Sequence, residues 1–179
     1  MCVREASRTH IQFSGRLGLM PNILFVCTAN ICRSPMAGVM FERLVRNKKL
    51  SGSWTAASAG TWAQDGNRAS ANGRELMSNW GMDLGKHRSR VVNPGLLGAA
   101  DLVLTMEKSH KEAILAEFKE TAGRVFLLSE MVGEDREIRD PYGGSMQEYH
   151  ETAMEIAAYL ENGLPKILEL VERGRRPPG

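Results

Sequence analysis

Short apolar runs alternate with helix-like stretches along most of the chain, and this alternation constrains the fold more than any other feature. Ile, Val and Leu fill most of the apolar runs with little polar alternation, which is typical of parallel strands buried on both faces. Strand–helix alternation implies right-handed crossovers with helices on both sides of the sheet. The predicted strands are Asn22–Cys27, Trp54–Ala59, Asp101–Met106 and Arg124–Leu128, and the predicted helices are Pro35–Asn47, Ala69–Trp80, Lys108–Glu117 and Met146–Val171. We therefore predict an α/β fold with a four-stranded parallel sheet (Rossmann-like).

The chain length of 179 residues suits one domain with one buried core. Residues 1–19 show no period of two or of 3.6, and Met20 stands directly before the first predicted strand. We predict a disordered N-terminal extension over residues 1–19, a domain over residues 20–172 and a flexible tail over residues 173–179. An ordered N-terminal arm is the alternative.

Charge and cysteine content limit the classes of partner and the compartment. The formal net charge is only +2, so no strong overall field attracts nucleic acid or anionic lipid. Three cysteines are too few for a disulfide framework and indicate a reducing compartment. The first apolar run is too short to span a bilayer, and no signal-peptide pattern is present. We expect a cytoplasmic protein that binds neither nucleic acid nor a membrane.

A turn at residues 27–34, with the sequence Cys-Thr-Ala-Asn-Ile-Cys-Arg-Ser, follows the first predicted strand. In sheets of this kind, ligands bind beyond the carboxyl ends of the strands. We expect Ser34 to cap the next helix and Pro35 to lie in its first turn, where the missing N–H costs nothing. The N–H groups of the turn, together with the helix dipole, would then favour a phosphoryl dianion.

The side chains of this turn suit phosphoryl transfer. The positive field favours the thiolate form of Cys27, which is the nucleophile. Arg33 has a planar fork that can hold two phosphoryl oxygens, and the Ser34 hydroxyl can donate to the thiolate. Asn30 tolerates left-handed geometry and would hold the turn together. The alternative is a buried cysteine that simply ends a core strand. The strand before the turn, the helix after it, the arginine and the hydroxyl together favour catalysis.

The segment Val26–Pro35 resembles the phosphate loop of the low-molecular-weight protein-tyrosine phosphatases. The resemblance continues through Ser58–Thr61, Ala100–Met106 and Asp140–Tyr142, and it covers about residues 20–171. It implies the fold of that family (phosphotyrosine phosphatase I-like) and hydrolysis of phosphotyrosine through a cysteinyl-phosphate, with no metal or other cofactor. It also implies that Cys27 and Arg33 are catalytic and that the remaining loop residues bind phosphate: Thr28, Ala29, Asn30, Ile31, Cys32 and Ser34.

Asp140 is the candidate general acid, because the departing phenolate needs a proton and the resemblance assigns that role to the Asp-Pro pair. Pro141 stiffens this turn and biases Asp140 toward an extended backbone. Without the phosphate loop, an Asp-Pro pair would only predict a turn.

Trp62 and Tyr142 are candidate walls for the phosphotyrosine ring. Aromatic contacts of this kind contribute about 0.5–1.5 kcal/mol beyond the area they bury. The alternative for Trp62 is packing over the end of the sheet, and Gly143 stands where some family members carry a second aromatic residue. Trp54 and Trp80 are assigned to packing.

Cys32 adjoins Arg33, and the resemblance implies a reversible disulfide with Cys27 that protects the nucleophile from deeper oxidation. A passive buried thiol is the alternative. His87 is assigned a structural role, because Gly38 stands where the family often has an acidic partner for a histidine near this position.

Three other functions remain as alternatives. A thioredoxin-coupled arsenate reductase needs further cysteines downstream, and the sequence has none after Cys32. A phosphoarginine phosphatase is the second: the resemblance implies that threonine at the fifth loop position favours it, whereas Ile31 stands here and favours tyrosine. A non-catalytic phosphate-binding module would lack the nucleophile, the arginine or the acid, and all three are present. We expect phosphotyrosine-bearing proteins and a cognate tyrosine kinase as partners.

Overall fold

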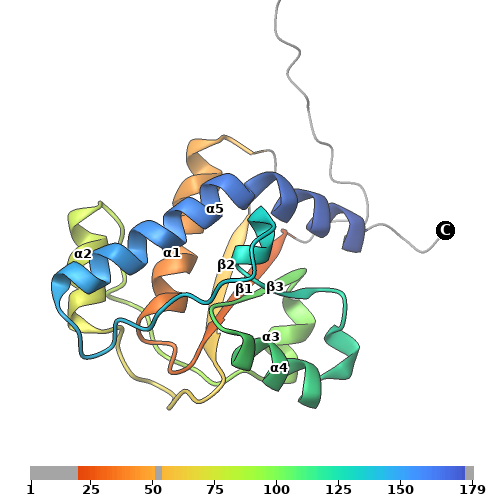
Figure 1. The fold of residues 1–179 in the computed structure, drawn as a ribbon, viewed down its shortest axis with the longest axis horizontal. Helices are drawn as coiled ribbons and strands as arrows, with labels where there is room; N and C mark the ends of the chain where they lie inside the picture. The colour runs from red at the N-terminus through yellow and green to blue at the C-terminus, as the bar shows by residue number, and fades with distance from the viewer. Residues whose placement is uncertain (1–19, 51–53, 176–179) are drawn as a thin grey trace, which may run out of the picture.

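The computed structural model describes residues 20–50 and 54–175 (Figure 1). They form one parallel sheet of four strands in the order β2-β1-β3-β4. The strands are β1 (Asn22–Cys27), β2 (Thr55–Gly60), β3 (Leu102–Thr105) and β4 (Val125–Leu127). The predicted α/β single-domain fold is therefore confirmed. The predicted extension at residues 1–19 lies outside the described residues, as does the end of the predicted tail at residues 176–179.

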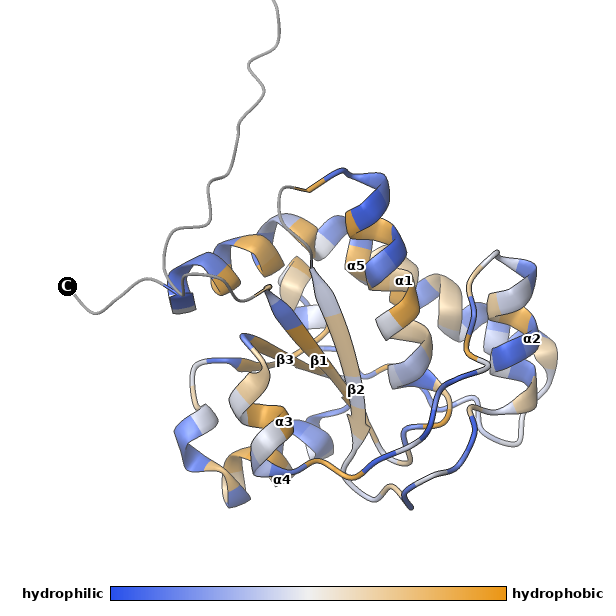
Figure 2. Cartoon of the chain, turned by 180° about the vertical axis from the view of Figure 1, so that it is seen from behind, coloured by the Kyte–Doolittle hydropathy of each residue, from blue (hydrophilic) through white to orange (hydrophobic). Residues whose placement is uncertain are grey.

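Helices cover both faces of the sheet, as predicted (Figures 1 and 2). One face carries the long helix α5 beside α1, and α2 packs against α5. The other face carries the two shorter helices α3 and α4. The helices are α1 (Arg33–Asn47), α2 (Ala71–Asn79), α3 (Pro94–Ala99), α4 (Lys108–Glu117) and α5 (Met146–Arg175), with 3-10 turns η1 (Lys119–Thr121) and η2 (Ser129–Val132).

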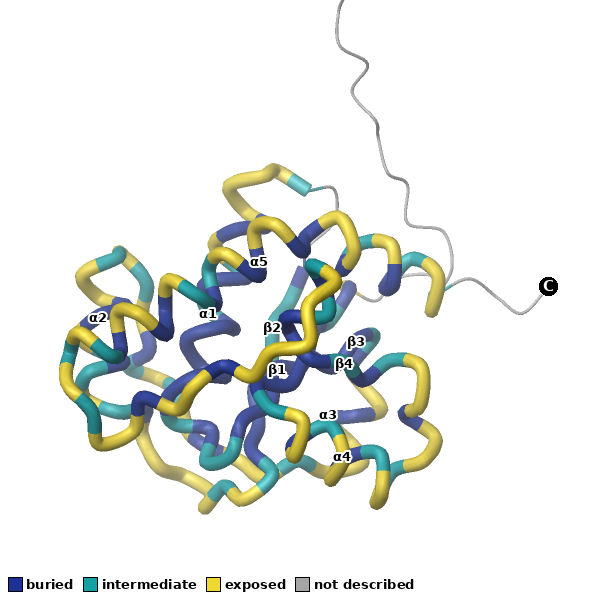
Figure 3. Tube along the Cα trace, in the orientation of Figure 1, coloured by how far each residue is buried: buried dark blue, intermediate teal, exposed yellow. Residues whose placement is uncertain are grey.

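Strand β1 lies between β2 and β3 and is buried on both sides (Figure 3). Successive side chains of a strand point to opposite faces of the sheet. Ile23 and Phe25 accordingly join the core beneath α1 and α5, while Leu24 and Val26 join the core beneath α3 and α4. This double burial explains why the β1 sequence is a continuous apolar run.

The ends of several elements differ from the prediction. Helix α1 begins at Arg33, with Cys32 rather than Ser34 at the N-cap position. The prediction for Ser34 was wrong because its side chain turns inward, where it contacts the end of β1. Helix α3 was not predicted, although Asn93 accepts a hydrogen bond from the Leu96 N–H as its N-cap and Pro94 opens its first turn.

Helix α5 continues to Arg175, so the helix includes the first three residues of the predicted tail, which began at residue 173. The Arg175 Nε lies 3.5 Å from an Asp101 carboxylate oxygen, and the other oxygen of Asp101 accepts the Asn22 N–H at 2.8 Å. This long-range ion pair gives the last turn a tertiary contact that the local sequence does not reveal. Among the described helices, none has the length and apolar character needed to cross a bilayer.

Glycine at position 163 permits close packing of α5 against η2. A Cβ atom there would lie 2.5 Å from the Met131 Cβ, well inside van der Waals contact. We predict that Gly163→Ala lowers the free energy of unfolding by about 1–3 kcal/mol, the usual cost of overpacking a core. Gly174→Ala, on the same helix with no atom within 4 Å of the added Cβ, serves as the control. It should leave stability unchanged or raise it by up to about 1 kcal/mol. Chemical denaturation measures both, and equal effects would contradict the packing argument.

Candidate active site

The turn after β1 wraps around the buried side chain of Asn30. Its backbone has a φ of 55°, so the left-handed geometry predicted for Asn30 is confirmed. The Asn30 Nδ2 donates to the Ser34 Oγ at 2.9 Å, and its Oδ1 accepts the Arg90 N–H at 3.0 Å. The Asn30 carbonyl oxygen lies 2.7 Å from the His87 Nε2, which agrees with the structural role assigned to His87. The turn is thus fixed from both ends and from the segment before α3.

Cys27 is the last residue of β1 and is buried at the base of this turn. Its Sγ lies 3.0 Å from the Ser34 Oγ. The Ser34 Oγ accepts the Asn30 amide, and both the Cys27 sulfur and the Ala59 carbonyl oxygen, the latter at 3.3 Å, lie within reach of its own hydroxyl hydrogen. No backbone N–H of residues 29–33 donates to another oxygen of the described chain. This arrangement suits a tetrahedral oxyanion placed above the sulfur.

Arg33 is 1% exposed and joins segments that are far apart in sequence. Its Nη1 donates to the Glu107 carboxylate and, at 2.8 Å, to the Ile138 carbonyl oxygen. Its Nη2 donates to the Asp140 Oδ2 at 2.7 Å and to the Thr28 Oγ1 at 3.3 Å. Arg33 and Asp140 are separated by 107 positions along the chain. The structure therefore brings the predicted nucleophile, arginine and acid together at one end of the sheet.

The Asp-Pro segment presents Asp140 at the protein surface, with its side chain 39% exposed. The second carboxylate oxygen of Asp140 accepts the Tyr142 N–H at 3.2 Å, and this bond fixes the turn around Pro141. Asp140 thus has one oxygen on the buried guanidinium and the other on its own turn. A carboxyl group in this position can exchange a proton with a group bound outside the loop.

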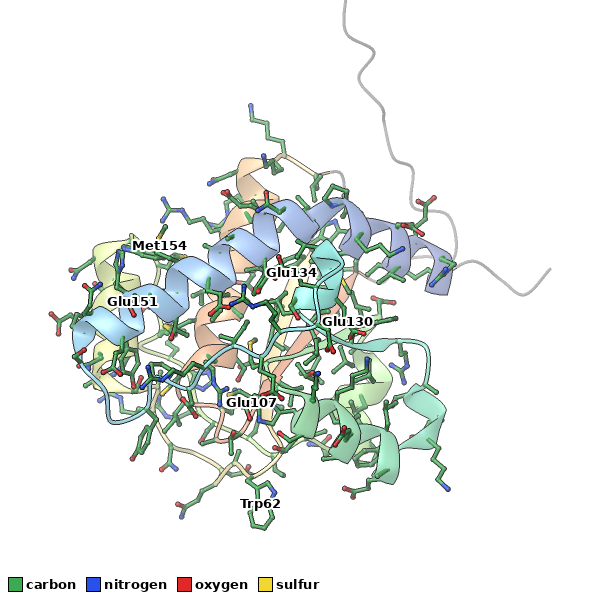
Figure 4. The ribbon with its side chains drawn as sticks, in the orientation of Figure 1. Trp62, Glu107, Glu130, Glu134, Glu151 and Met154 are labelled. Atoms are coloured by element: carbon green, nitrogen blue, oxygen red, sulfur yellow. The ribbon has the colours of Figure 1, made fainter. Side chains whose placement is uncertain are left out.

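Glu107 is a site residue that the sequence analysis missed. It follows the end of β3, as the N-cap of α4, and its side chain is partly buried, near the middle of the view in Figure 4. Burial acts to raise the pKa of Glu107, but the Arg33 guanidinium outweighs it and lowers the pKa. Glu107 is therefore a carboxylate at neutral pH and shares Arg33 with Asp140. Its position after a parallel strand was the only sequence signal.

Cys32 is buried, and its Sγ lies 3.1 Å from the Tyr149 hydroxyl oxygen. Burial raises the pKa of the Cys32 thiol and also that of the Tyr149 hydroxyl. At neutral pH both groups therefore keep their protons. Cys27 and Cys32 are free thiols in this structure, and the disulfide between them stays a prediction.

The backbones of the two predicted aromatic wall residues, Trp62 and Tyr142, lie close to the residues of the site. The Trp62 N–H donates to the Thr28 carbonyl oxygen at 2.9 Å, and Tyr142 adjoins the Asp-Pro pair. The two residues are 84% and 70% exposed, and Figure 4 shows the Trp62 ring pointing away from the body of the protein. Contact of these rings with a substrate stays a prediction. Trp54 packs against Phe41 with their ring centroids 5.9 Å apart, as expected for a core residue.

Comparisons with known proteins point to one family. The family model described as low molecular weight phosphotyrosine protein phosphatase matches residues 22–175. A protein-arginine-phosphatase of Bacillus subtilis is 34% identical over 156 residues, which cover 87% of this chain and 99% of the relative. A probable low molecular weight protein-tyrosine-phosphatase, EpsP, of Ralstonia nicotianae is 33% identical over 152 residues, which cover 85% of this chain and 99% of the relative.

Solved structures agree with these sequence relatives. A low molecular weight protein tyrosine phosphatase from T. tengcongensis superposes with a TM-score of 0.76 at 37% identity, over 82% of this chain and 99% of the other. A solved YwlE mutant from Bacillus subtilis superposes with a TM-score of 0.77 at 34% identity, over 83% of this chain and 99% of the other. The similarity thus spans nearly the whole length of each solved chain.

The contacts of Asn30 predict how the turn responds to substitution. Asn30→Ala removes two hydrogen bonds and places a Cβ-bearing residue without a side-chain bond at positive φ. Each lost bond costs about 1 kcal/mol, and the positive φ, which asparagine tolerates better than alanine, adds up to about 2 kcal/mol. We expect chemical denaturation to show a loss of about 2–4 kcal/mol for this variant. Asn30→Gly, which lacks the same bonds but accepts positive φ, should lose about 1 kcal/mol less. A glycine variant as unstable as the alanine variant would show that the backbone geometry carries no cost.

Proposed function

The chain belongs to the low molecular weight phosphotyrosine protein phosphatase family, and on this premise we propose that it hydrolyses phosphotyrosine on proteins through a phosphocysteine at Cys27. The observation that carries the proposal is that three groups lie at the same end of the sheet: the Cys27 sulfur, the Arg33 guanidinium and the Asp140 carboxylate. A nucleophile, an oxyanion clamp and an acid are the groups that such a reaction requires.

In the first step, the Cys27 thiolate attacks phosphorus, an S–P bond forms and the P–O bond to the tyrosine ring breaks. The Asp140 carboxylic acid gives its proton to the departing phenolate. The phosphoryl oxygens take up hydrogen bonds from the loop N–H groups and from Arg33, whose Nη2 exchanges Asp140 for the phosphoryl group. This exchange is favourable because the dianion carries more charge than the carboxylate.

In the second step, a water molecule attacks the phosphocysteine while the Asp140 carboxylate accepts its proton. The S–P bond breaks, inorganic phosphate forms and the sulfur leaves as a thiolate. The Ser34 hydroxyl, 3.0 Å from the sulfur, stabilises that leaving group by donating its hydrogen.

Tyrosine is the preferred substrate in this proposal, because Ile31 stands at the loop position where the family resemblance associates threonine with phosphoarginine. The exposed Trp62 and Tyr142 rings would flank the phosphotyrosine ring at the mouth of the loop. Phosphoarginine is the second candidate. It is favoured by the relatives from Bacillus subtilis and Geobacillus stearothermophilus, 34% and 35% identical, that are named protein-arginine-phosphatases.

We propose phosphotyrosine-bearing proteins as substrates and a cognate tyrosine kinase as the partner that generates them. We also propose a cytoplasmic location, because a reducing compartment would keep the Cys27 thiol free.

A panel of phosphotyrosine, phosphoserine and phosphoarginine peptides tests the proposal. We expect release of phosphate from phosphotyrosine, none from phosphoserine, and a kcat/KM for phosphoarginine at least about tenfold lower. Cys27→Ser should abolish turnover of phosphotyrosine and of phosphoarginine while still binding inorganic phosphate, because the loop amides and Arg33 remain. A higher kcat/KM for phosphoarginine would favour the second candidate, and substantial turnover by Cys27→Ser would reject the covalent mechanism.

The role of Asp140 predicts a dependence on the leaving group. Asp140→Asn should lower kcat/KM by about 10²–10⁴-fold with phosphotyrosine, the usual worth of a general acid. The loss should be much smaller with p-nitrophenyl phosphate, whose leaving group needs less protonation. Asp135→Asn is the matched control, since Asp135 is 70% exposed and pairs with Lys108 at the surface. An equal loss with both substrates would remove Asp140 from the role of acid.

A further inference from the structure

Four residues, with the phosphate-binding arginine among them, form a closed ring of hydrogen bonds. Arg33 donates to the Glu107 carboxylate from Nη1 and to the Thr28 Oγ1 from Nη2, the latter at 3.3 Å. The Glu107 backbone N–H lies 3.2 Å from the His110 Nδ1, and the His110 Nε2 lies 2.9 Å from the Thr28 Oγ1. The ring joins the turn after β1 to the start of α4.

These contacts determine the protonation of His110. A backbone N–H can only donate, so the Nδ1 atom that accepts it must carry a lone pair. A neutral imidazole then carries its hydrogen on Nε2, which donates to the Thr28 hydroxyl oxygen. His110 is 3% exposed and belongs to α4, one turn after Glu107. The backbone of α4 thus sets the tautomer of its own histidine.

The charged groups around His110 act in opposite directions. Burial lowers the pKa of His110, and the Arg33 charge lowers it further, whereas the carboxylates of Glu107, Asp140 and Glu137 act to raise it. The net effect is a lowered pKa, so His110 is neutral at pH 7 and keeps the tautomer that the geometry requires.

The Thr28 hydroxyl contacts both His110 and Arg33. Its Oγ1 accepts one hydrogen from His110 and one from Arg33. Both lone pairs of a hydroxyl oxygen are then occupied, and only one direction remains for its own hydrogen. The hydroxyl is therefore fixed in rotation, and the Nη2 side of the guanidinium has a partner that stays in place when Asp140 leaves.

We propose that His110 is a positioning residue, which holds the Thr28 hydroxyl against Arg33 and thereby keeps the guanidinium aligned for the phosphoryl group. The inference rests on the proposed function, because it concerns the arginine that binds phosphate. During turnover Arg33 exchanges Asp140 for substrate, and the Thr28–His110 contact preserves its orientation through that exchange. His110 itself neither touches substrate nor transfers a proton.

The first test is the tautomer of His110 in the intact protein. Nitrogen-15 NMR at about pH 7 distinguishes an imidazole protonated at Nε2 from one protonated at Nδ1 or at both atoms. We expect the Nε2–H form. An Nδ1–H form or a doubly protonated ring would overturn the proposal, because Nδ1 could not then accept the Glu107 N–H.

The second test is a double-mutant cycle with p-nitrophenyl phosphate as substrate and inorganic phosphate as competitive inhibitor. His110→Asn keeps a side-chain acceptor for the Glu107 N–H but cannot reach Thr28, and Thr28→Val removes the hydroxyl at nearly equal volume. We expect each variant to lose about five- to tenfold in kcat/KM, the worth of one hydrogen bond, and phosphate inhibition to weaken in proportion. The double variant should be no worse than Thr28→Val alone. Thr28→Ser, which keeps the hydroxyl, should keep most of the activity that Thr28→Val loses.

Several outcomes reject the proposal. Losses that multiply in the double variant would show that the two residues act independently, and unchanged phosphate inhibition in His110→Asn would show that Arg33 does not depend on the histidine. If His110→Asn does not fold, the comparison of Thr28→Val with Thr28→Ser tests the hydroxyl that His110 holds, and equal kcat/KM values for these two variants would reject the proposal. Failure of the wild-type protein to hydrolyse p-nitrophenyl phosphate would reject the proposed function, whereas a wild-type rate in His110→Asn would reject this inference alone.

Discussion

The guanidinium of Arg33 is a positive charge with almost no access to water, and the arrangement of the site follows from how that charge is compensated. A buried charge is costly unless it is paired and hydrogen-bonded. Carboxylates from Glu107 and Asp140, together with the Ile138 carbonyl oxygen, compensate the two terminal nitrogens from two other segments, while the buried Nε has no hydrogen-bond partner among the described residues. The chain therefore cannot bury Arg33 without bringing the turn after β1, the start of α4 and the Asp-Pro segment together. Folding and assembly of the site are the same event at this point.

The same pairing bears on how the arginine can serve an anionic substrate. Glu107 is the more buried of the two carboxylates, with 28% of its side chain exposed against 39% for Asp140. The less buried carboxylate is the one that a phosphoryl group would displace, since its release to water costs less. Glu107 then remains as a fixed counter-charge that orients the guanidinium. The two carboxylates thus differ in role because the Glu107 side chain is more deeply buried than that of Asp140.

The sequence predicted the sheet, both helical layers and the turn that contains Cys27 because these features depend on local patterns. A continuous apolar run such as residues 23–26 predicts a doubly buried strand, and the residue types of the turn predict its chemistry. Long-range partners escaped prediction. Glu107 has no local signal beyond its place after a strand, and the pairing of Arg175 with Asp101, which accompanies the extra helical turn, joins distant segments.

Ser34 illustrates a different limit of sequence reasoning. A serine before a proline at a helix start predicts an N-cap, yet its hydroxyl contacts Cys27 and Asn30 instead. Both arrangements satisfy the same hydroxyl, so residue type alone cannot separate them. The difference depends on where the helix begins: α1 starts two residues before the predicted Pro35, so Ser34 lies inside α1 and its side chain faces the sheet.

The strand order β2-β1-β3-β4 means that the chain leaves β1 toward one edge of the sheet and later returns to build the other. The connections after β1 and β3 consequently diverge, and Cys27 and Glu107 stand where these two connections begin. Residues farther from the strands, such as 61–66 and 142–145, form surface connections with little share in the core. Such connections tolerate changes in length and side chain far better than the strands beneath them. Substitutions in these surface connections can therefore change which molecules reach the Cys27 sulfur, while the buried strands and turn that set the reactivity of the sulfur stay constant.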